Sequence, residues 1–173
     1  MRPLQYSIYK GMAGKWGELQ LNLQPPHFYS GRNKDYTGYE AMENGTLRDG
    51  WKLREGTIFM EITSTKDKNV YDWDNKIVLA LSITDVGKIL HSLYTGKECS
   101  IMHDPGAKSE TQGKIKKNLN VASPKGTSNG CMVRASYTAA GETKSHQVPL
   151  SGDELIVMKE LLQAAVPQML KWD

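Results

Sequence analysis

A short apolar run followed at once by an amphipathic helix, within residues 71–93, is the feature that most constrains the fold of this chain. The run at residues 77–82 is too short for a helix and carries β-branched residues between turn residues, so it predicts a strand. Ser82 then occupies an N-cap position, and Asp85 suits the positive end of a helix. Apolar residues follow at helical spacing: Ile83, Val86, Ile89, Leu90 and Leu93.

The rest of the chain predicts further short strands and one more helix. Strands are expected at residues 5–9, 16–23, 57–63, 98–102, 114–121, 131–138 and 143–150, in addition to 77–82. Because the turns between them have hairpin length, we expect antiparallel sheets and an α+β fold. The order is four strands and a helix, repeated once. The second helix spans residues 154–170, and Pro167 should kink or end it.

The second helix is apolar on nearly every side. A helix of this kind is buried on more than one face, and one sheet of a small domain covers only one face. We therefore expect self-association through this helix, with an oligomer core made by Leu155, Met158, Leu162, Ala165, Val166 and Met169.

Residues 24–55 have no sustained periodicity and are expected to form a long loop insertion in a single domain covering residues 1–173. The segment mixes aromatic residues with cations, as a nucleic-acid surface does. The alternative is an insertion packed over an edge of the sheet. The sequence favours neither.

Composition argues for a soluble binding protein and against a catalyst. The chain has 173 residues and a net charge of +3, which permits a polyanionic partner without requiring one. Two cysteines without ligand spacing predict buried thiols in a reducing compartment. We find no apolar run long enough for a membrane span, no metal-ligand spacing and no phosphate loop, so we expect no cofactor. His103 and Asp104 precede Pro105 and Gly106, a composition typical of a turn.

The strand at residues 114–121 carries the clearest binding pattern. Its alternation places Lys114, Lys116, Asn118 and Asn120 on one face. Cations and amides on an open sheet face suit a sugar-phosphate backbone, and Tyr9, Trp16 and Trp73 offer stacking surfaces. The alternative is an ordinary solvated outer face.

Taken together, these segments resemble the Whirly family of plant organellar single-stranded DNA-binding proteins. The resemblance covers most of the chain, in the right order and spacing. It rests on residues 6–11, 53–62, 71–73, 79–82, 86–87, 103–105, 113–117, 148–149, 157–158, 166–167 and 172–173.

The resemblance implies a ββββα-ββββα fold, with two antiparallel four-stranded sheets packed crosswise and helices at their base. It also implies a homotetramer around a core of C-terminal helices, with single-stranded DNA bound along the sheet edges with little sequence preference. Membership would mean protection of organellar DNA and an influence on transcription, in the chloroplast or alternatively the mitochondrion. A transit peptide would then lie outside this numbering. No membrane or small-molecule cofactor is expected.

Pattern and resemblance together predict a nucleic-acid path. Its candidates are Tyr9, Lys10, Lys15, Trp16, Gln20, Met60, Trp73, Asn75, Lys76, Lys114, Lys116, Asn118, Asn120 and Arg134. The chain departs from the family at Met12, where the family has a second lysine linked to DNA contact and higher-order assembly.

Two other functions remain open at this point. Mitochondrial guide-RNA-binding proteins of kinetoplastids share the Whirly fold, so the ligand could be RNA. A non-catalytic protein-assembly module would use the same sheet face without binding oligonucleotides.

Overall fold

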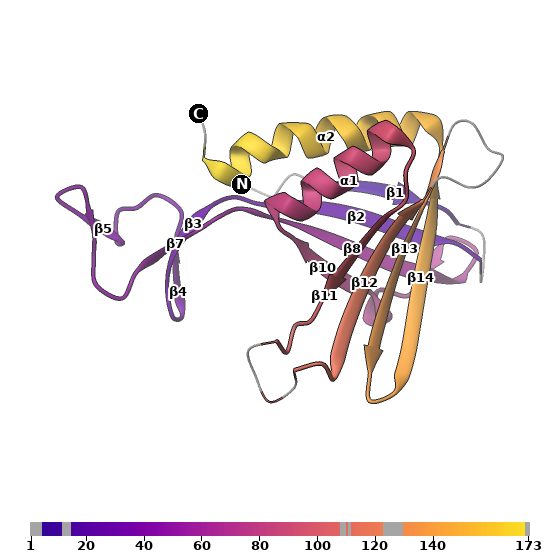
Figure 1. Ribbon diagram of the computed structural model, residues 1–173, viewed down its shortest axis with the longest axis horizontal. Coiled ribbons are helices and arrows are strands. Elements are labelled where there is room, and N and C mark those ends of the chain that lie inside the picture. Colours follow the sequence, from indigo (N-terminus) through magenta and orange to yellow (C-terminus); the bar gives the residue numbers. More distant parts are fainter. Residues whose placement is uncertain (1–4, 12–14, 108–109, 111, 123–129, 172–173) are drawn as a thin grey trace.

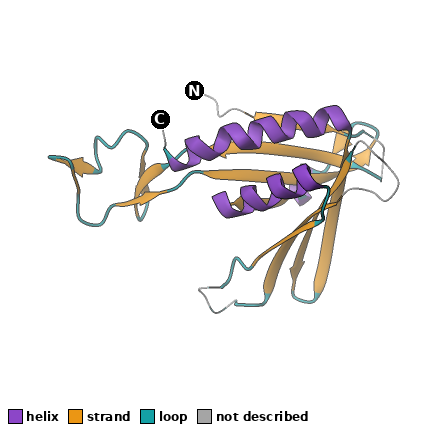
Figure 2. Ribbon diagram, turned by 45° about the horizontal axis from the view of Figure 1, so that its top comes forward, coloured by secondary structure: helices purple, strands orange, loops and turns teal. Residues whose placement is uncertain are grey.

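The computed structural model describes residues 5–11, 15–107, 110, 112–122 and 130–171 (Figure 1). Two antiparallel sheets run across one another, and both helices lie along the same side of the molecule (Figures 1 and 2). The main elements come in the predicted order, four strands and a helix followed by four strands and a helix, and the α+β class is confirmed. Met12 lies outside the described residues.

The first sheet has the strand order β1-β2-β8-β10, with the short β9 paired to β8. Rows of aligned residues such as Leu19, Ile62 and Ile77 place one apolar face toward the core. β8 is longer than predicted and the sheet has a fifth strand, because the end of β8 pairs with β9. The bounds are Gln5–Tyr9 for β1, Gly17–Gln24 for β2, Thr57–Asp67 for β8, Val70–Tyr71 for β9 and Ile77–Leu81 for β10.

The second sheet is a simple meander, β11-β12-β13-β14. Leu119 and Val121 point inward from β12 and are buried, as the alternation predicts. Both cysteines are buried, and desolvation raises the pKa of the Cys131 thiol to about 11. The bounds are Cys99–His103 for β11, Ile115–Ala122 for β12, Cys131–Ala139 for β13 and Glu142–Leu150 for β14.

The first helix, α1 (Ile83–Thr95), begins where the sequence predicts. The Ser82 hydroxyl accepts a hydrogen bond from the Asp85 backbone N–H at 3.2 Å, and the Asp85 carboxylate accepts one from the Ser82 N–H at 3.0 Å. This capping box satisfies backbone donors that a helix start leaves unpaired. Gly96 ends the helix in the left-handed conformation.

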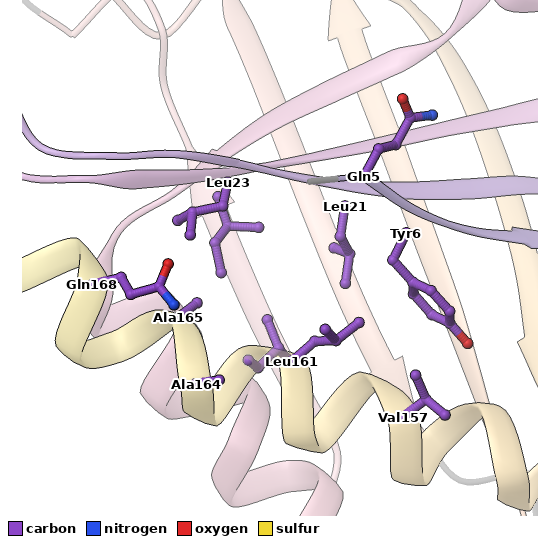
Figure 3. Close-up of a pocket in the computed structure, with 11 residues that line it drawn as sticks. Gln5, Tyr6, Leu21, Leu23, Val157, Leu161, Ala164, Ala165 and Gln168 are labelled. Atoms are coloured by element: carbon purple, nitrogen blue, oxygen red, sulfur yellow. The ribbon is translucent and has the colours of Figure 1, made fainter. Parts of the chain in front are cut away.

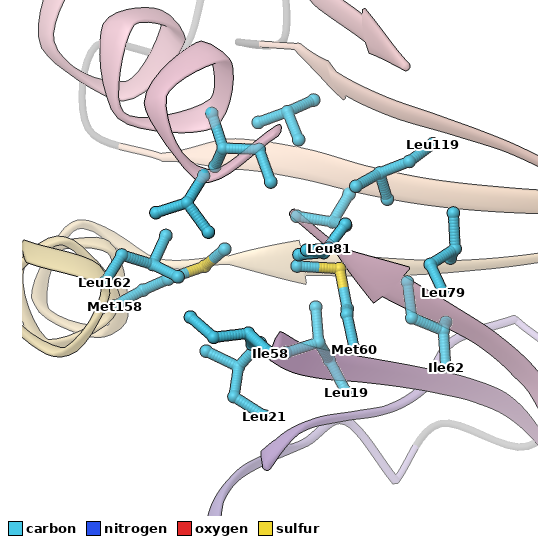
Figure 4. Close-up of a cluster of buried hydrophobic side chains, with 14 of the residues drawn as sticks. Leu19, Leu21, Ile58, Met60, Ile62, Leu79, Leu81, Leu119, Met158 and Leu162 are labelled. Atoms are coloured by element: carbon cyan, nitrogen blue, oxygen red, sulfur yellow. The ribbon is translucent and has the colours of Figure 1, made fainter. Parts of the chain in front are cut away.

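The second helix, α2 (Gly152–Leu170), lies along the first sheet and next to α1 (Figure 1). Met158 and Leu162 enter the core that the two sheets share with the helices (Figure 4). The helix passes through Pro167 and ends three residues later. Within one protomer it is buried on one side only, since Ile156, Val157 and Leu161 remain exposed on it.

Residues 25–56, here called the arm, contain short strands where the sequence predicts a long loop insertion at residues 24–55. They form a three-stranded sheet with the order β4-β3-β7 and a separate β5-β6 hairpin, and they project beyond the two main sheets (Figure 1). The strands are too short to show a periodicity. Their bounds are His27–Ser30 for β3, Asn33–Asp35 for β4, Met42–Glu43 for β5, Thr46–Leu47 for β6 and Lys52–Arg54 for β7.

Two further findings concern membrane-spanning helices and metal sites. No helix in the described part of the chain has the length and apolar character needed to cross a bilayer. The same residues contain no group of three His, Cys, Asp or Glu side chains arranged to hold a metal ion.

Candidate nucleic-acid interface

The outer face of the second sheet is polar across three of its strands. Asn120, Arg134 and Gln147 are direct cross-strand neighbours on β12, β13 and β14. The Arg134 guanidinium donates to the Gln147 side-chain oxygen at 2.9 and 3.3 Å, which holds the cation over the sheet. The next row places Asn118, Ser136 and Ser145 side by side, and Lys116 follows at the open end. The face therefore presents fixed amides and hydroxyls together with two cations.

A cleft of about 290 Å³ lies where this face meets the first sheet. Trp16 and Lys15 enter it from the start of β2, with the Lys15 ammonium 5.1 Å from the indole centroid. The Thr65 hydroxyl on β8 donates to the Trp16 carbonyl at 2.8 Å, which fixes the backbone there. The lining comes from both sheets and consists of Lys15, Trp16, Ser64, Arg134, Ser145, His146 and Gln147.

His146 links the two sheets beside this cleft. Its Nε2–H donates to the Asn75 carbonyl at 2.8 Å, and the Lys144 ammonium donates to the same oxygen at 3.3 Å. Its Nδ1 atom is buried without a hydrogen-bond partner in the described residues. With Nε2 as the donor, a neutral ring leaves Nδ1 as an acceptor.

Asn75 and Trp73 belong to a short 3₁₀ turn, η1 (Trp73–Asn75), ahead of β10. The Asn75 amide donates to Asp72 at 2.8 Å, so the turn is held by its own side chains. Lys76 follows, with its ammonium 5.7 Å from the Trp73 ring and 2.6 Å from a Glu61 carboxylate oxygen. This ion pair partly neutralises Lys76, which is therefore a weaker phosphate ligand than an unpaired lysine.

Tyr9 and Gln20 lie on the outer face of the first sheet. Tyr9 is 59% exposed, and its ring centroid lies 5.8 Å from that of Tyr71. Gln20 donates to the buried Glu18 carboxylate at 2.9 Å. Burial raises the pKa of Glu18, although that hydrogen bond opposes the shift.

Two of the predicted site residues do not join this surface. Met60 is fully buried in the core between the first sheet and the helices (Figure 4), because β8 alternates and Met60 shares the inward face with Ile58 and Ile62. Lys10 turns toward α2 and pairs with Glu154 at 2.7 Å. Lys114 is exposed in the turn just before β12 and stays near the open end of the polar face.

Three members of the cleft lie on β14 and were not predicted from the sequence, namely Ser145, His146 and Gln147. The strand itself was predicted, but its place opposite Trp16 depends on how the two sheets cross. One feature of the sequence could have suggested these three residues. The polar positions that alternate along β14 pair with the polar positions of β13.

A second, apolar surface lies on the opposite side of the first sheet. A groove of about 380 Å³ runs between that sheet and α2 (Figure 3). Tyr6, Leu21 and Leu23 point into it from β1 and β2, and Val157 and Leu161 line its helix side (Figure 3). The residues predicted as the oligomer core are placed differently: Met158, Leu162, Ala165 and Met169 are buried inside the protomer, and Leu155 and Val166 are partly buried against the same core.

Comparison with known proteins agrees with this architecture. The profile of a family described as Whirly transcription factor matches residues 9–161. The mitochondrial single-stranded DNA-binding protein WHY2 of Arabidopsis thaliana is 28% identical over 170 residues, which is 97% of this chain and 63% of that protein. The chloroplastic single-stranded DNA-binding protein WHY1 of Solanum tuberosum is 25% identical over 168 residues, 96% of this chain and 54% of that protein.

A solved structure shows the same fold. The plant transcriptional regulator PBF-2 superposes with a TM-score of 0.78 at 26% identity, over 99% of this chain and 85% of that chain. This chain therefore spans between half and two thirds of the length of the curated relatives it matches, and most of the solved chain. Since the family profile covers most of the residues and the fold agrees, the chain belongs to the Whirly family.

Proposed function

We propose that this protein binds single-stranded DNA with little sequence preference, through the outer face of the second sheet and the cleft beside it. The observation that carries the proposal is the cleft, where an indole, two cations and polar residues of both sheets meet. Cations bind phosphates whatever the base, and an aromatic ring stacks on any base. The relatives WHY2 and WHY1, both named single-stranded DNA-binding proteins, support this reading.

We further infer a non-catalytic role in an organelle, in the maintenance of DNA and the control of its transcription. The curated relatives are named mitochondrial and chloroplastic, and PBF-2 is described as a transcriptional regulator. In this proposal the whole chain acts as one nucleic-acid-binding domain, and the arm is an insertion in it.

The direct test is titration of fluorescent oligomers of about 30 nucleotides as single-stranded DNA, single-stranded RNA and duplex DNA, at low and moderate salt. We expect single-stranded DNA to bind most tightly and to weaken as salt rises. Tighter binding to RNA would indicate an RNA-binding member of this fold. Absence of binding to all three would refute the proposed function while leaving the fold unchanged.

We also propose that the protein self-associates through the apolar groove and the side of α2 that borders it at Val157 and Leu161, up to a homotetramer. Val157 and Leu161 are 41% and 40% exposed in the protomer, although both are large apolar side chains beside the groove. A second copy would bury these side chains and the groove wall, and burial of apolar surface drives protein association.

The test for self-association uses Val157→Asp with Leu161→Asp, compared with Gln163→Asp. Gln163 is exposed on the same helix and outside the groove, so its substitution adds a charge to α2 without entering the proposed contact. Light scattering should show monomers for the double variant and oligomers for the control, with the helical circular dichroism of both retained. A double variant that keeps the wild-type mass would contradict the proposal.

A further inference from the structure

We propose that the arm carries a second contact surface for single-stranded nucleic acid, on one face of its β4-β3-β7 sheet. This inference rests on the proposed function and adds a binding surface to it. The register defines the face. Tyr29 pairs with Lys34 on one side and with Lys52 on the other, and the row two residues away pairs His27 with Arg54. Together with Tyr36, whose ring centroid lies 5.2 Å from that of His27, these six residues are called the arm face.

The arm face is basic and aromatic. Lys34, Lys52 and Arg54 are exposed, and none of the six residues of the face is acidic. The Arg54 guanidinium lies 4.6 Å from the centroid of the Tyr29 ring, which holds its plane against the sheet. Cations spaced across an aromatic surface match the charge and the stacking surfaces of a single strand.

The other face of the same small sheet is partly covered by the arm itself, although Leu53, across from Phe28 on β7, is 56% exposed. Phe28 points to that side, where it packs close to Gly38 and Met42 and lies 5.5 Å below the Lys171 ammonium. Asp35, directly across from Phe28, is buried there. The arm's own loop thus covers this face at Phe28 and Asp35, whereas the three cations of the arm face are exposed.

Asp35 also gives the arm a defined shape. Its carboxylate accepts hydrogen bonds from the backbone N–H groups of Thr37, Gly38, Glu40 and Ala41 and from the Thr37 hydroxyl, at 2.8 to 3.0 Å. Burial alone would raise the pKa of this carboxyl, but the hydrogen bonds outweigh it and lower the pKa well below its usual range. A prefolded arm loses less conformational entropy when it binds than a mobile loop would.

The arm face continues the outer face of the first sheet. Gln24 lies on that outer face at the end of β2, in alternation with the inward Leu23, and its amide donates to the Tyr36 hydroxyl at 3.2 Å. On the opposite side of the junction, the Gly56 N–H donates to the Met169 carbonyl at the end of α2. The arm face and Gln20 are therefore on the same side of the molecule, and β2 runs from the cleft at its start to the arm at its end.

The distance between the cleft and the arm determines which oligomers can test this inference. β2 has eight residues, so at about 3.3 Å per residue it separates the cleft from the arm by roughly 26 Å. An oligomer of about 4 nucleotides, roughly 14 Å long at about 3.4 Å per stacked nucleotide, should fill the cleft region alone, whereas one of about 30 nucleotides should also reach the arm.

The variant Lys34→Gln, Lys52→Gln, Arg54→Gln removes the three cations of the arm face. Fluorescence anisotropy should show that its affinity for the long oligomer falls by up to about 500-fold at 50 mM salt and that its salt slope falls by up to about 2, the values for three cations that each hold one phosphate. Its affinity for the short oligomer should be unchanged. The matched control is Arg48→Gln, Lys88→Gln, Lys97→Gln, which removes the same charge from exposed positions outside the arm face.

The outcomes separate this inference from the proposed function. Equal losses in the control and the arm variant would show a general charge effect and overturn the inference. An arm variant whose affinity for the long oligomer equals that of wild type would also overturn the inference. The proposed function would still stand in that case, because the wild-type protein binds the oligomer. A wild-type protein that binds neither oligomer would refute both. Because all three substituted side chains are exposed, thermal unfolding of the arm variant should match wild type.

Discussion

The variant Lys116→Gln, Arg134→Gln removes the two cations of the polar face and should weaken DNA binding. The size of the loss depends on the salt concentration and can be calculated. Each phosphate contact on a single strand contributes about 0.7 to the slope of log affinity against log salt. If each cation holds one phosphate, their loss lowers that slope by about 1.4. Taking the affinities of variant and wild type as equal at about 1 M salt, the variant should bind about 70-fold more weakly than wild type at 50 mM salt. At 200 mM salt the difference should be about 10-fold.

The two cations suit this calculation because neither forms an ion pair with a carboxylate in the described residues. Lys116 is exposed, and Arg134 donates only to the neutral Gln147 side chain. The assay is anisotropy of a labelled single strand at several salt concentrations, with Lys88→Gln, Lys97→Gln on and just after α1 as the equal-charge control. The same fold-loss at both salt concentrations would refute the phosphate-contact reasoning, as would a loss of equal size in the control.

Three further predictions concern stability. Leu162→Ala should lower the free energy of unfolding by about 2–5 kcal/mol, because it opens a cavity in the core. The control Leu47→Ala, at an exposed position, should lower that free energy by less than about 0.5 kcal/mol. Urea unfolding measures both changes. Burial would raise the pKa of Asp85, but hydrogen bonds from Ser82 and the contact with His103 lower it overall. Its stabilisation is therefore complete above the unfolded-state pKa and is lost as pH falls below about 4, so the urea midpoint of Asp85→Asn should depend less on acid pH. Asp35→Ala should raise hydrogen exchange at residues 37–41 while leaving the main sheets protected.

Local patterns predicted the parts of the fold whose causes are local. The capping box of α1 needs only Ser82 and Asp85 in the right spacing, and the structure has both of its hydrogen bonds. β12 alternates so regularly that its buried and polar faces followed from the sequence. The arm was missed because its strands are two to four residues long and are organised by Asp35, whose hydrogen bonds reach up to six residues ahead.

The candidate site was harder to predict because it depends on how two sheets meet. Trp16 and His146 are far apart in sequence, and only the crossing of the sheets brings them to one cleft. Met60 shows the reverse error, because it shares one strand face with Ile58 and Ile62, and that pattern already indicated a buried position. The sequence of α2 is apolar on nearly every side, so it does not indicate which side of the helix packs on the sheet. Leu162 was therefore assigned to the oligomer core, although it is buried inside the protomer.

The two proposed contacts of the first sheet lie on opposite faces of the same strands. Leu21 points into the groove beside α2, whereas its neighbour Gln20 points to the outer face, which continues to the arm through Gln24 and Tyr36. A substitution in the groove such as Leu161→Asp therefore changes no residue on the DNA-binding side. For an oligomer of about 8 nucleotides, which one protomer can bind, the affinity per protomer should be that of wild type even when association is abolished. A longer strand should lose affinity, because adjoining protomers raise the effective concentration of further binding surfaces only while the oligomer is intact.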